Sequence, residues 1–351
     1  MQHQGEECQT DKGLFKGMDS HAYNAGFRSG DPLQLEQDGQ DANEPLHLHG
    51  VHRFSHFCLH YIIGTGQLSV MFILEKNLCR WDLGLSCRGG HGIMEIFREV
   101  ADMEDQFLNL TEENLDQEHL CCIIRSKKPH PGVEAKRAWL RERLREGHVF
   151  RKLDAKGVVF IEYAPLETAW VPVEGDNYLY IYCLWVSGEF KGKGYGRQLM
   201  EYCLADARAR GKSGVCMLGA EKQKAWLSDQ AFAAKYGFET VDTTPGGYRL
   251  LARSFDGTKP HFAENAKQLE IESSDLTIYY SPQCPYIHQS VELVHRTCGE
   301  LEVPYILIPV DTLEKAKALP GVFNNWAVFY QGKFVTVNLL NAAALKRLLK
   351  K

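Results

Sequence analysis

The segment from Tyr178 to Arg210 constrains the fold more than any other part of this chain. The apolar run Tyr178–Val186 predicts a buried strand, and apolar residues at helical spacing run from Leu199 to Arg210. Between them lie glycines at positions 192, 194 and 196. Glycine lets several backbone N–H groups converge on one anion, and the helix that follows adds its positive N-terminal end. The nearby cations are Lys191, Lys193 and Arg197. The segment therefore predicts a phosphate or pyrophosphate site.

Two common phosphate-binding motifs do not describe this turn. A P-loop requires Gly-x4-Gly-Lys-Ser/Thr, and the chain contains no such string. A dinucleotide-binding fold requires Gly-x-Gly-x-x-Gly after an early strand, whereas the spacing here is Gly-x-Gly-x-Gly. The turn therefore indicates a different phosphate fold.

The sequence Lys191-Gly192-Lys193-Gly194-Tyr195-Gly196 resembles the pyrophosphate loop of the GNAT family of N-acetyltransferases, Arg/Gln-x-x-Gly-x-Gly/Ala, with lysine in the first place. Further along, Lys235-Tyr236-Gly237-Phe238 resembles the helix-Gly-Phe ending of that family. The resemblance covers residues 104–255, which we expect to form one domain.

Hydrophobic patterns predict the other elements of that domain. A charged helix is expected over 133–146 and another over 230–236, and strands are expected at 158–163, 169–173, 178–186, 214–218 and 238–241. The resulting order is helix, three strands, loop and helix, strand, helix, strand. This order is that of the GNAT fold, an α/β (α+β) fold with a mixed central sheet.

The resemblance implies acetyl-CoA as co-substrate and direct acetyl transfer to an amine in a ternary complex. The acceptor would be a small-molecule or protein amine. The implied cofactor-binding residues are Leu184, Trp185, Val186, Lys191, Gly192, Lys193, Gly194, Tyr195, Gly196 and Arg197. The strand residues would hydrogen-bond the pantetheine arm, and the backbone of the loop would hold the pyrophosphate.

The catalytic acid and base stay open at the level of sequence. In the family the proton donor is often a tyrosine four residues before the Gly-Phe glycine, and Ala233 stands at that position. The remaining candidates are Glu162, Tyr182, Cys183 and Tyr236. For Glu162, a purely hydrogen-bonded strand carboxylate is the alternative to a general base.

A second domain is expected over residues 275–351, after a polar linker at 256–274. Its pattern predicts strands at 276–280, 305–309, 326–330 and 333–337, and helices at 287–301, 312–318 and 342–349. This order resembles a small thioredoxin-like α/β domain, and Cys284-Pro285-Tyr286 resembles the glutaredoxin motif. Ile287 occupies the place of the second cysteine, and Asn325 that of the proline which normally faces the thiol. Cys284 is therefore a candidate for monothiol redox chemistry, as a thiolate stabilised by the helix N-terminus.

An acetyltransferase followed by such a domain resembles the YoaP-type acetyltransferases. Three hypotheses remain open: an acetyl-CoA-dependent N-acetyltransferase, a thiol-redox or thiol-capture protein that uses Cys284 and binds acyl-CoA, and a non-catalytic acyl-CoA-binding module. Retained turnover after Cys284→Ser would separate the first from the second.

Composition limits the partners and the compartment. The net charge of −5 does not favour binding to nucleic acid or to an anionic membrane. The longest uncharged stretch, 61–74, is too short to span a bilayer. The 11 cysteines show no framework spacing, and no signal peptide is recognised, so we expect a cytoplasmic protein with reduced thiols. The oligomeric state is left open.

Residues 1–103 show no sustained helical or strand period. We expect either a disordered extension or an over-extended gene model whose true start is Met103. The histidine and cysteine cluster between His47 and His60 lacks the paired spacing of a tetrahedral site, so no metal is predicted.

Overall fold

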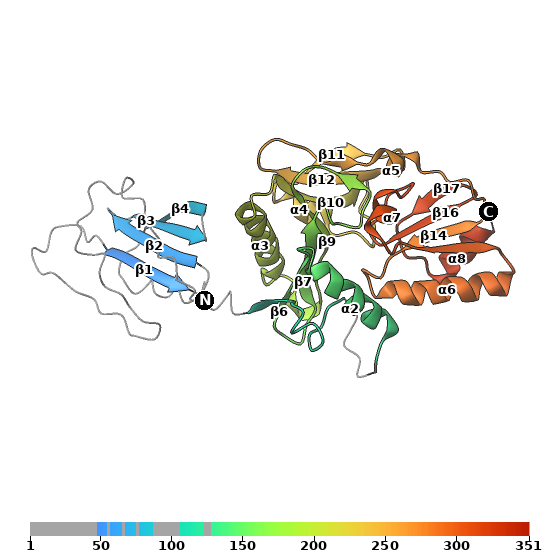
Figure 1. The fold of residues 1–351 in the computed structure, drawn as a ribbon, viewed down its shortest axis with the longest axis horizontal. Coiled ribbons are helices and arrows are strands. Elements are labelled where there is room, and N and C mark those ends of the chain that lie inside the picture. Colours follow the sequence, from blue (N-terminus) through green and yellow to red (C-terminus); the bar gives the residue numbers. More distant parts are fainter. Residues whose placement is uncertain are drawn as a thin grey trace, which may run out of the picture.

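The structure is a computed structural model that describes residues 106–122 and 128–350, together with the backbone of four strands between residues 48 and 86. These strands are β1 (Leu48–Phe54), β2 (Phe57–Gly64), β3 (Gln67–Leu74) and β4 (Asn77–Ser86). They pair in sequence order as an antiparallel sheet (Figure 1). The expectation of no regular structure is corrected for these residues, since short connections allow successive strands to pair as hairpins. The remainder of 1–103, and the side chains of the histidine cluster, lie outside the described residues.

A seven-stranded mixed sheet organises the next part of the chain. Its strands are β5 (Phe107–Asn109), β6 (Val149–Leu153), β7 (Val159–Pro165), β9 (Tyr178–Val186), β10 (Gly214–Ala220), β11 (Glu239–Thr243) and β12 (Tyr248–Ser254). The strand order is β11-β12-β10-β9-β7-β6-β5. Neighbouring strands are antiparallel except β9 and β10, which are parallel. The expected mixed central sheet is therefore present.

Three helices accompany this sheet: α2 (Pro131–Leu144), α3 (Tyr195–Ala209) and α4 (Gln230–Ala234). Helix α3 packs on β7, β9 and β10 (Figure 1). Its buried face carries Leu199, Cys203, Leu204 and Ala207 at helical spacing. This packing fixes the direction in which the N-terminus of α3 points, next to the end of β9.

One predicted strand in this region is wrong. Residues 166–172 form successive local turns, with hydrogen bonds such as Ala169 N–H to Leu166 O at 3.2 Å and Val171 N–H to Ala169 O at 2.9 Å. Only Val173 of the predicted strand 169–173 belongs to a strand, β8 (Val173–Glu174). Ala169, Trp170 and Val171 are buried in the core, so the segment is apolar. Because buried turns and buried strands are both apolar, this pattern led to the wrong prediction of a strand. The three strands of the seven-stranded sheet that follow α2 are β6, β7 and β9, so the strand that was missing from the prediction is β6, the first of them; β12 was also missed.

The expected linker 256–274 contains regular structure. It holds β13 (His261–Phe262), which pairs with β8, and α5 (Glu264–Gln268). Phe262 and Ala266 from this segment are buried in the core of the seven-stranded sheet. The segment therefore packs as part of the body of the molecule.

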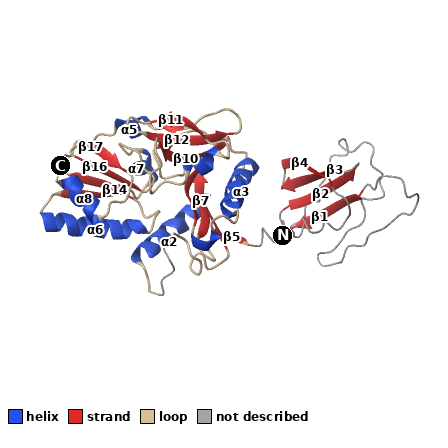
Figure 2. Ribbon diagram, turned by 180° about the vertical axis from the view of Figure 1, so that it is seen from behind, coloured by secondary structure: helices blue, strands red, loops and turns tan. Residues whose placement is uncertain are grey.

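The C-terminal unit contains a four-stranded sheet. Its elements are β14 (Leu276–Tyr280), α6 (Tyr286–Leu301), β15 (Tyr305–Pro309), α7 (Leu313–Lys317), β16 (Trp326–Tyr330), β17 (Lys333–Thr336) and α8 (Ala342–Leu349). The strand order is β15-β14-β16-β17, with β14 and β15 parallel and the other pairs antiparallel. Helices α6 and α8 pack against each other, as Figure 2 shows from behind.

The two units share their cores. Val322 and Val337 of the C-terminal unit belong to one buried cluster with Tyr180 and Tyr248 of the first unit. The interface also has polar contacts: the Tyr180 hydroxyl donates to Asn324 Oδ1 at 2.9 Å, and the Asn324 amide donates to the carbonyl of Tyr182 at 3.3 Å. Among the described residues, no helix combines the length and hydropathy that crossing a bilayer requires.

Candidate active site

The sheet opens where β9 and β10 separate. These parallel strands pair only as far as Ile181 and Met217. On its other side, β9 shifts register against β7, so that Glu162 opposes Cys183 while Tyr163 opposes Ile181. Tyr182 is thus an extra residue in β9, a bulge of the kind that re-aims a strand next to a site. Beyond Ile181, β9 no longer pairs with β10, and the Tyr182 carbonyl accepts instead from the Asn324 side-chain amide at 3.3 Å.

A second side-chain contact lies further along β9. The N–H of Leu184 donates to Ser228 Oγ at 3.2 Å across the gap between β9 and β10. A small hollow lies beside it, lined by Ile181, Tyr182, Met217, Leu218, Leu227, Ser228 and Asn324. Asn324 comes from the C-terminal unit, so both units line the hollow.

The glycine-rich loop, residues 191–197, follows β9 after a single 3-10 turn at Gly188–Phe190 and is called the glycine cradle below. Gly192 and Gly194 have φ angles of 77° and 83°, and a Cβ atom built on either would meet nothing within 4 Å. Gly194 precedes α3, and no side chain of the described residues caps that helix. The first backbone N–H groups of α3 have no intrahelical acceptor, so they are available to an anion.

The structure brings the predicted cofactor-binding residues together in one continuous stretch at the mouth of the opening. Leu184 and Val186 are half-buried, and Trp185 is exposed. The side chains of Lys191, Lys193 and Arg197 are exposed, whereas Tyr195 is half-buried against the core. The Lys193 Nζ atom lies 5.7 Å from the centre of the Phe190 ring. Gly196 lies against Phe232 and Val186, at 3.5 and 3.6 Å from the position of a Cβ atom. These contacts anchor the cradle between β9 and α4 while leaving its N–H groups exposed.

A second polar centre lies inside the protein, where the two units meet. Glu162 on β7 is fully buried and accepts from Lys136 Nζ at 2.6 Å, from His148 Nε2 at 3.1 Å and from Gln283 Nε2 at 2.9 Å. Lys136 comes from α2, His148 precedes β6, and Gln283 belongs to the C-terminal unit. We call these four residues the interdomain cluster. The carboxylate has a partner from each of three separate segments.

The protonation states in this cluster follow from burial and pairing. Burial raises the pKa of Glu162, but the Lys136 ammonium and the His148 hydrogen bond outweigh it and hold the pKa below its usual range. Burial lowers the pKa of Lys136, and the Glu162 charge more than reverses this and raises it. Burial lowers the pKa of His148, against the opposing effect of Glu162. At neutral pH the cluster therefore holds one ion pair and a neutral imidazole that donates to the carboxylate.

The four catalytic candidates occupy very different surroundings. Glu162 is enclosed and fully partnered, so it acts here as the central acceptor of the cluster. The Tyr182 hydroxyl accepts from the Trp170 N–H at 2.6 Å, its ring stacks on His148, and burial raises its pKa. Burial likewise raises the pKa of Cys183. Tyr236 is half-buried against Phe232, next to the cradle, and desolvation raises its pKa. Ala233, at the family's tyrosine position, is buried.

Cys284 and Cys122 influence each other's titration. Cys122 lies at the end of the described segment 106–122, and both side chains are half-buried. Hydrogen bonding to Cys284 lowers the pKa of Cys122 to about 7, burial opposes the shift, and the charge of Lys136 adds to it. The same bond, together with burial, raises the pKa of Cys284 well above its usual range. The thiolate expected at Cys284 is thus favoured at Cys122 instead.

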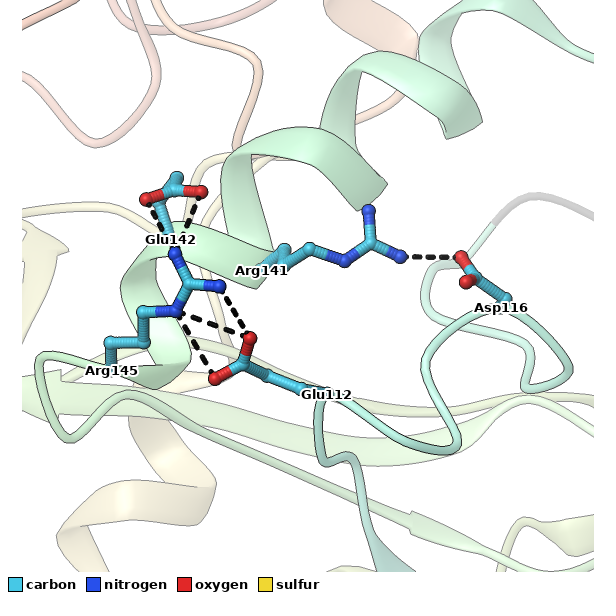
Figure 3. A network of polar contacts seen from close by, with 5 residues as sticks. All are labelled: Glu112, Asp116, Arg141, Glu142 and Arg145. Carbon is cyan, nitrogen blue, oxygen red and sulfur yellow. Dashed lines mark hydrogen bonds and ion pairs between the residues drawn. The ribbon is translucent and has the colours of Figure 1, made fainter.

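The segment that carries Cys122 is held in place by Arg141 of α2 and by Arg145, which directly follows that helix. Arg145 pairs with Glu112 at 2.6 Å and Arg141 with Asp116 at 2.6 Å, while Glu142 also contacts Arg145 (Figure 3). A buried lysine adds to these exposed pairs: Lys152 Nζ lies 2.7 Å from Glu118. Ion pairs at Glu112, Asp116 and Glu118 therefore hold this segment against the rest of the domain.

Comparison with known proteins places this geometry in a family. A model of the acetyltransferase (GNAT) family matches residues 110–238, and a model described as YoaP-like matches residues 304–350. The uncharacterized N-acetyltransferase YoaP of Bacillus subtilis strain 168 is 33% identical over 245 residues, which cover 69% of this chain and 98% of the relative. The chain belongs to the GNAT family of acetyltransferases. It is an acetyltransferase of the YoaP-like kind within that family.

Solved GNAT structures resemble part of the chain. The PaiA N-acetyltransferase of Thermoplasma acidophilum, solved in complex with coenzyme A, has a TM-score of 0.31 and 15% identity, covering 42% of this chain and 99% of its own. A GNAT acetyltransferase of Brucella melitensis in complex with acetyl-CoA has a TM-score of 0.29 and 14% identity, with coverages of 44% and 91%.

Sequence reasoning did not select five of the residues described above: Lys136, His148, Gln283, Cys122 and Asn324. Gln283 stands directly before Cys284, so the motif itself offered a signal. The other four lie in segments without a motif, and only the folded sheet brings them to β7 and β9. No residue pattern could have connected them in advance.

Proposed function

We propose that this acetyltransferase moves the acetyl group of acetyl-CoA to an amine while both substrates are bound. The observation that carries the proposal is the opening between β9 and β10, with the uncapped N-terminus of α3 directly beside it. A pyrophosphate on the cradle would accept from the first N–H groups of α3, with the helix dipole favouring its charge. Lys191, Lys193 and Arg197 would add positive charge around it.

The pantetheine arm would then extend along the part of β9 that no longer pairs with β10. The Leu184 N–H already donates into this gap, to Ser228 Oγ, so it is oriented toward a ligand carbonyl that would replace the hydroxyl. In that position the thioester would lie near the hollow that Tyr182, Ser228 and Asn324 line. Backbone donors at that point would stabilise negative charge on the carbonyl oxygen during transfer.

The acceptor amine would approach from the side of the C-terminal unit. Asn324 lines the hollow, and Tyr286 of α6 packs edge-to-face on the exposed Trp226, with ring centres 5.6 Å apart. We propose that the C-terminal unit is a thioredoxin-like domain, which its strand order β15-β14-β16-β17 supports. In this arrangement it forms one wall of the acceptor site. We place the protein in the cytoplasm on the basis of its cysteine usage.

The test is calorimetric titration of the full chain with acetyl-CoA and with CoA, followed by initial-rate kinetics with panels of small amines and peptide N-termini. Micromolar binding of both ligands and intersecting double-reciprocal plots for acetyl-CoA and acceptor would support direct transfer. Parallel plots would indicate an acetyl-enzyme and overturn the ternary complex. Absence of CoA binding would refute the cradle, and binding without turnover on any amine would favour the non-catalytic module.

A further inference from the structure

One side chain of the C-terminal unit reaches the point where β9 and β10 separate. Asn324 lies in the loop between α7 and β16 and is 7% exposed. Its amide N–H donates to the Tyr182 carbonyl at 3.3 Å, and its Oδ1 atom accepts from the Tyr180 hydroxyl at 2.9 Å. Both partners belong to β9, so Asn324 contacts the residues on either side of Ile181, the last residue that pairs with β10.

The backbone of Tyr182 has no ladder partner on either neighbouring strand. Tyr182 is the extra residue of β9 in its pairing with β7. The parallel pairing with β10 stops one residue earlier, and Leu218, the next residue of β10, pairs with Leu250 of β12. A buried carbonyl needs a donor, because leaving it unpaired destabilises the fold. The Asn324 amide supplies that donor in place of a strand.

The loop that carries Asn324 is held by both units. Phe323, directly before it, is buried in a core that residues of the two units share. Asn325, directly after it, donates through its side-chain amide to Gln283 Oε1 at 2.8 Å. Gln283 in turn donates to Glu162 of the interdomain cluster at 2.9 Å. The Asn324 amide is therefore presented to β9 by a fixed frame.

The conformation at Tyr182 determines the direction of the next backbone donor on that edge. Leu184 lies two residues further along β9, and the backbone groups of residues i and i+2 of a strand point to the same side. Its N–H donates to Ser228 Oγ at 3.2 Å, and Ser228 lines the same hollow as Asn324. A bulge re-aims the strand that contains it, so the contact at Tyr182 controls where the Leu184 N–H points.

We propose that Asn324 is a positioning residue for acetyl transfer: by holding the Tyr182 carbonyl, it keeps β9 apart from β10 and keeps the Leu184 N–H directed at the pantetheine arm. This role depends on the proposed path of the arm along β9. The pyrophosphate would be held by the glycine cradle, a separate segment. Asn324 therefore acts on the placement of the thioester and not on the affinity for CoA, and through it the C-terminal unit contributes to the transferase site.

The test measures, in full-length variants, the Kd for CoA by calorimetric titration and kcat with acetyl-CoA and the best amine of the panel. Asn324→Ala removes both contacts, whereas Asn324→Asp keeps the acceptor for the Tyr180 hydroxyl and places an oxygen against the Tyr182 carbonyl. We expect kcat to fall on the order of 100-fold in both variants, the loss that a misplacement of about 1 Å can cause, with the Kd for CoA unchanged.

Tyr248→Phe is the matched control. It also removes a buried hydrogen bond between the units, which the Val337 N–H donates to the Tyr248 hydroxyl at 3.1 Å, but it leaves Asn324 in place. It should keep the wild-type kcat. Tyr180→Phe should lower kcat less than Asn324→Ala, because the amide keeps its N–H and loses only the hydroxyl that orients it. If Tyr180 acts through Asn324, the double variant should equal Asn324→Ala. Should Asn324→Ala fail to fold, Tyr180→Phe against Tyr248→Phe decides.

A further measurement needs no ligand. Hydrogen–deuterium exchange of peptides that cover residues 178–186 should be faster in Asn324→Ala than in wild type and in Tyr248→Phe. The proposal would be overturned by a wild-type kcat in Asn324→Ala, by an equal fall of kcat in Tyr248→Phe, or by unchanged exchange in β9. A wild-type protein that did not bind CoA would instead refute the cradle, and the exchange experiment would still decide whether Asn324 holds β9.

Discussion

The glycine cradle and the interdomain cluster differ in how the chain builds them. The cradle is seven consecutive residues, 191–197, open to solvent and dependent on backbone N–H groups. The cluster gathers Lys136, His148, Glu162 and Gln283 from four separate segments and excludes solvent from all of them. Function in the first depends on a local conformation, and stability in the second depends on the whole fold.

This difference determines how each region responds to change. In the cradle, a substitution can remove a ligand without removing a protein contact, because nothing packs on Gly192 or Gly194. In the cluster, removal of one partner leaves a buried charge without a counter-charge. The resulting loss of folding stability is larger than the stability that a surface ion pair contributes. Binding and stability should therefore be separable by mutation.

Glu162→Gln should have the largest effect, on stability. The substitution keeps the size of the side chain but leaves the buried Lys136 ammonium group without a counter-charge, so we expect unfolding to become easier by about 3–5 kcal/mol. Urea denaturation followed by fluorescence measures this loss. The matched control is Glu112→Gln, which breaks the exposed pair with Arg145 shown in Figure 3 and should leave stability within error of wild type.

A double variant sharpens this test. Lys136→Met removes the ammonium group and retains most of the apolar stem, so Lys136→Met with Glu162→Gln should be more stable than Glu162→Gln alone. If the single variant Glu162→Gln unfolded at the same urea concentration as wild type, the cluster would not hold a buried ion pair.

Gly194→Asp should have the next largest effect, on ligand binding. A carboxylate at the start of α3 repels the pyrophosphate, and two unit charges 4 Å apart at an effective dielectric of 20 interact by about 4 kcal/mol. We therefore expect CoA affinity to fall by at least about 100-fold, as each tenfold corresponds to about 1.4 kcal/mol. The protein should still fold, since acidic groups near a helix N-terminus stabilise it.

Gly211→Asp is the matched control for this substitution. Gly211 lies just beyond the other end of α3, has a φ of 63° and offers the same open space around its Cβ position. It therefore reproduces the backbone strain and the added charge without approaching the cradle. Equal loss of CoA binding in both variants would contradict the assignment of the cradle, and calorimetric titration decides between these outcomes.

The sequence predicted the glycine cradle and its flanking elements well, but it did not predict the features that are assembled from distant segments. The strand Tyr178–Val186, the glycines that follow it and the helix up to Ala209 all lie within one segment, and the structure has them at the predicted places. The separation of β9 from β10 could not be predicted in the same way, because it depends on the bulge at Tyr182 and on pairing with a strand more than thirty residues away.

The mistaken strand at 169–173 shows the same limit. Its apolar residues are buried by turns, whereas Val149–Leu153, with Arg151 and Lys152 in its centre, forms a strand that the hydrophobic pattern obscured. Lys152 is buried because Glu118 pairs with it, and the sequence alone does not indicate a partner so far away in the chain. Glu162 was selected as a candidate base for its residue type, while its three partners became known only from the fold.

The pH dependence of stability should reveal the smallest effect, from His148. Burial keeps the folded-state pKa of His148 below its ordinary value of about 6.5, so the unfolded chain binds more protons than the folded chain as the pH falls. Its contribution to stability is present above pH 6.5 and is lost as the pH falls below it, with a slope of at most about 1.4 kcal/mol per pH unit for one proton.

Urea denaturation between pH 7.5 and 5 should therefore show a shallower dependence of stability on pH in His148→Gln than in wild type. His295→Gln, which changes an exposed histidine beside Tyr305, is the control and should keep the wild-type slope. Identical slopes in all three proteins would mean that His148 has the same pKa in the folded and unfolded states, which would contradict the lowering of its pKa by burial.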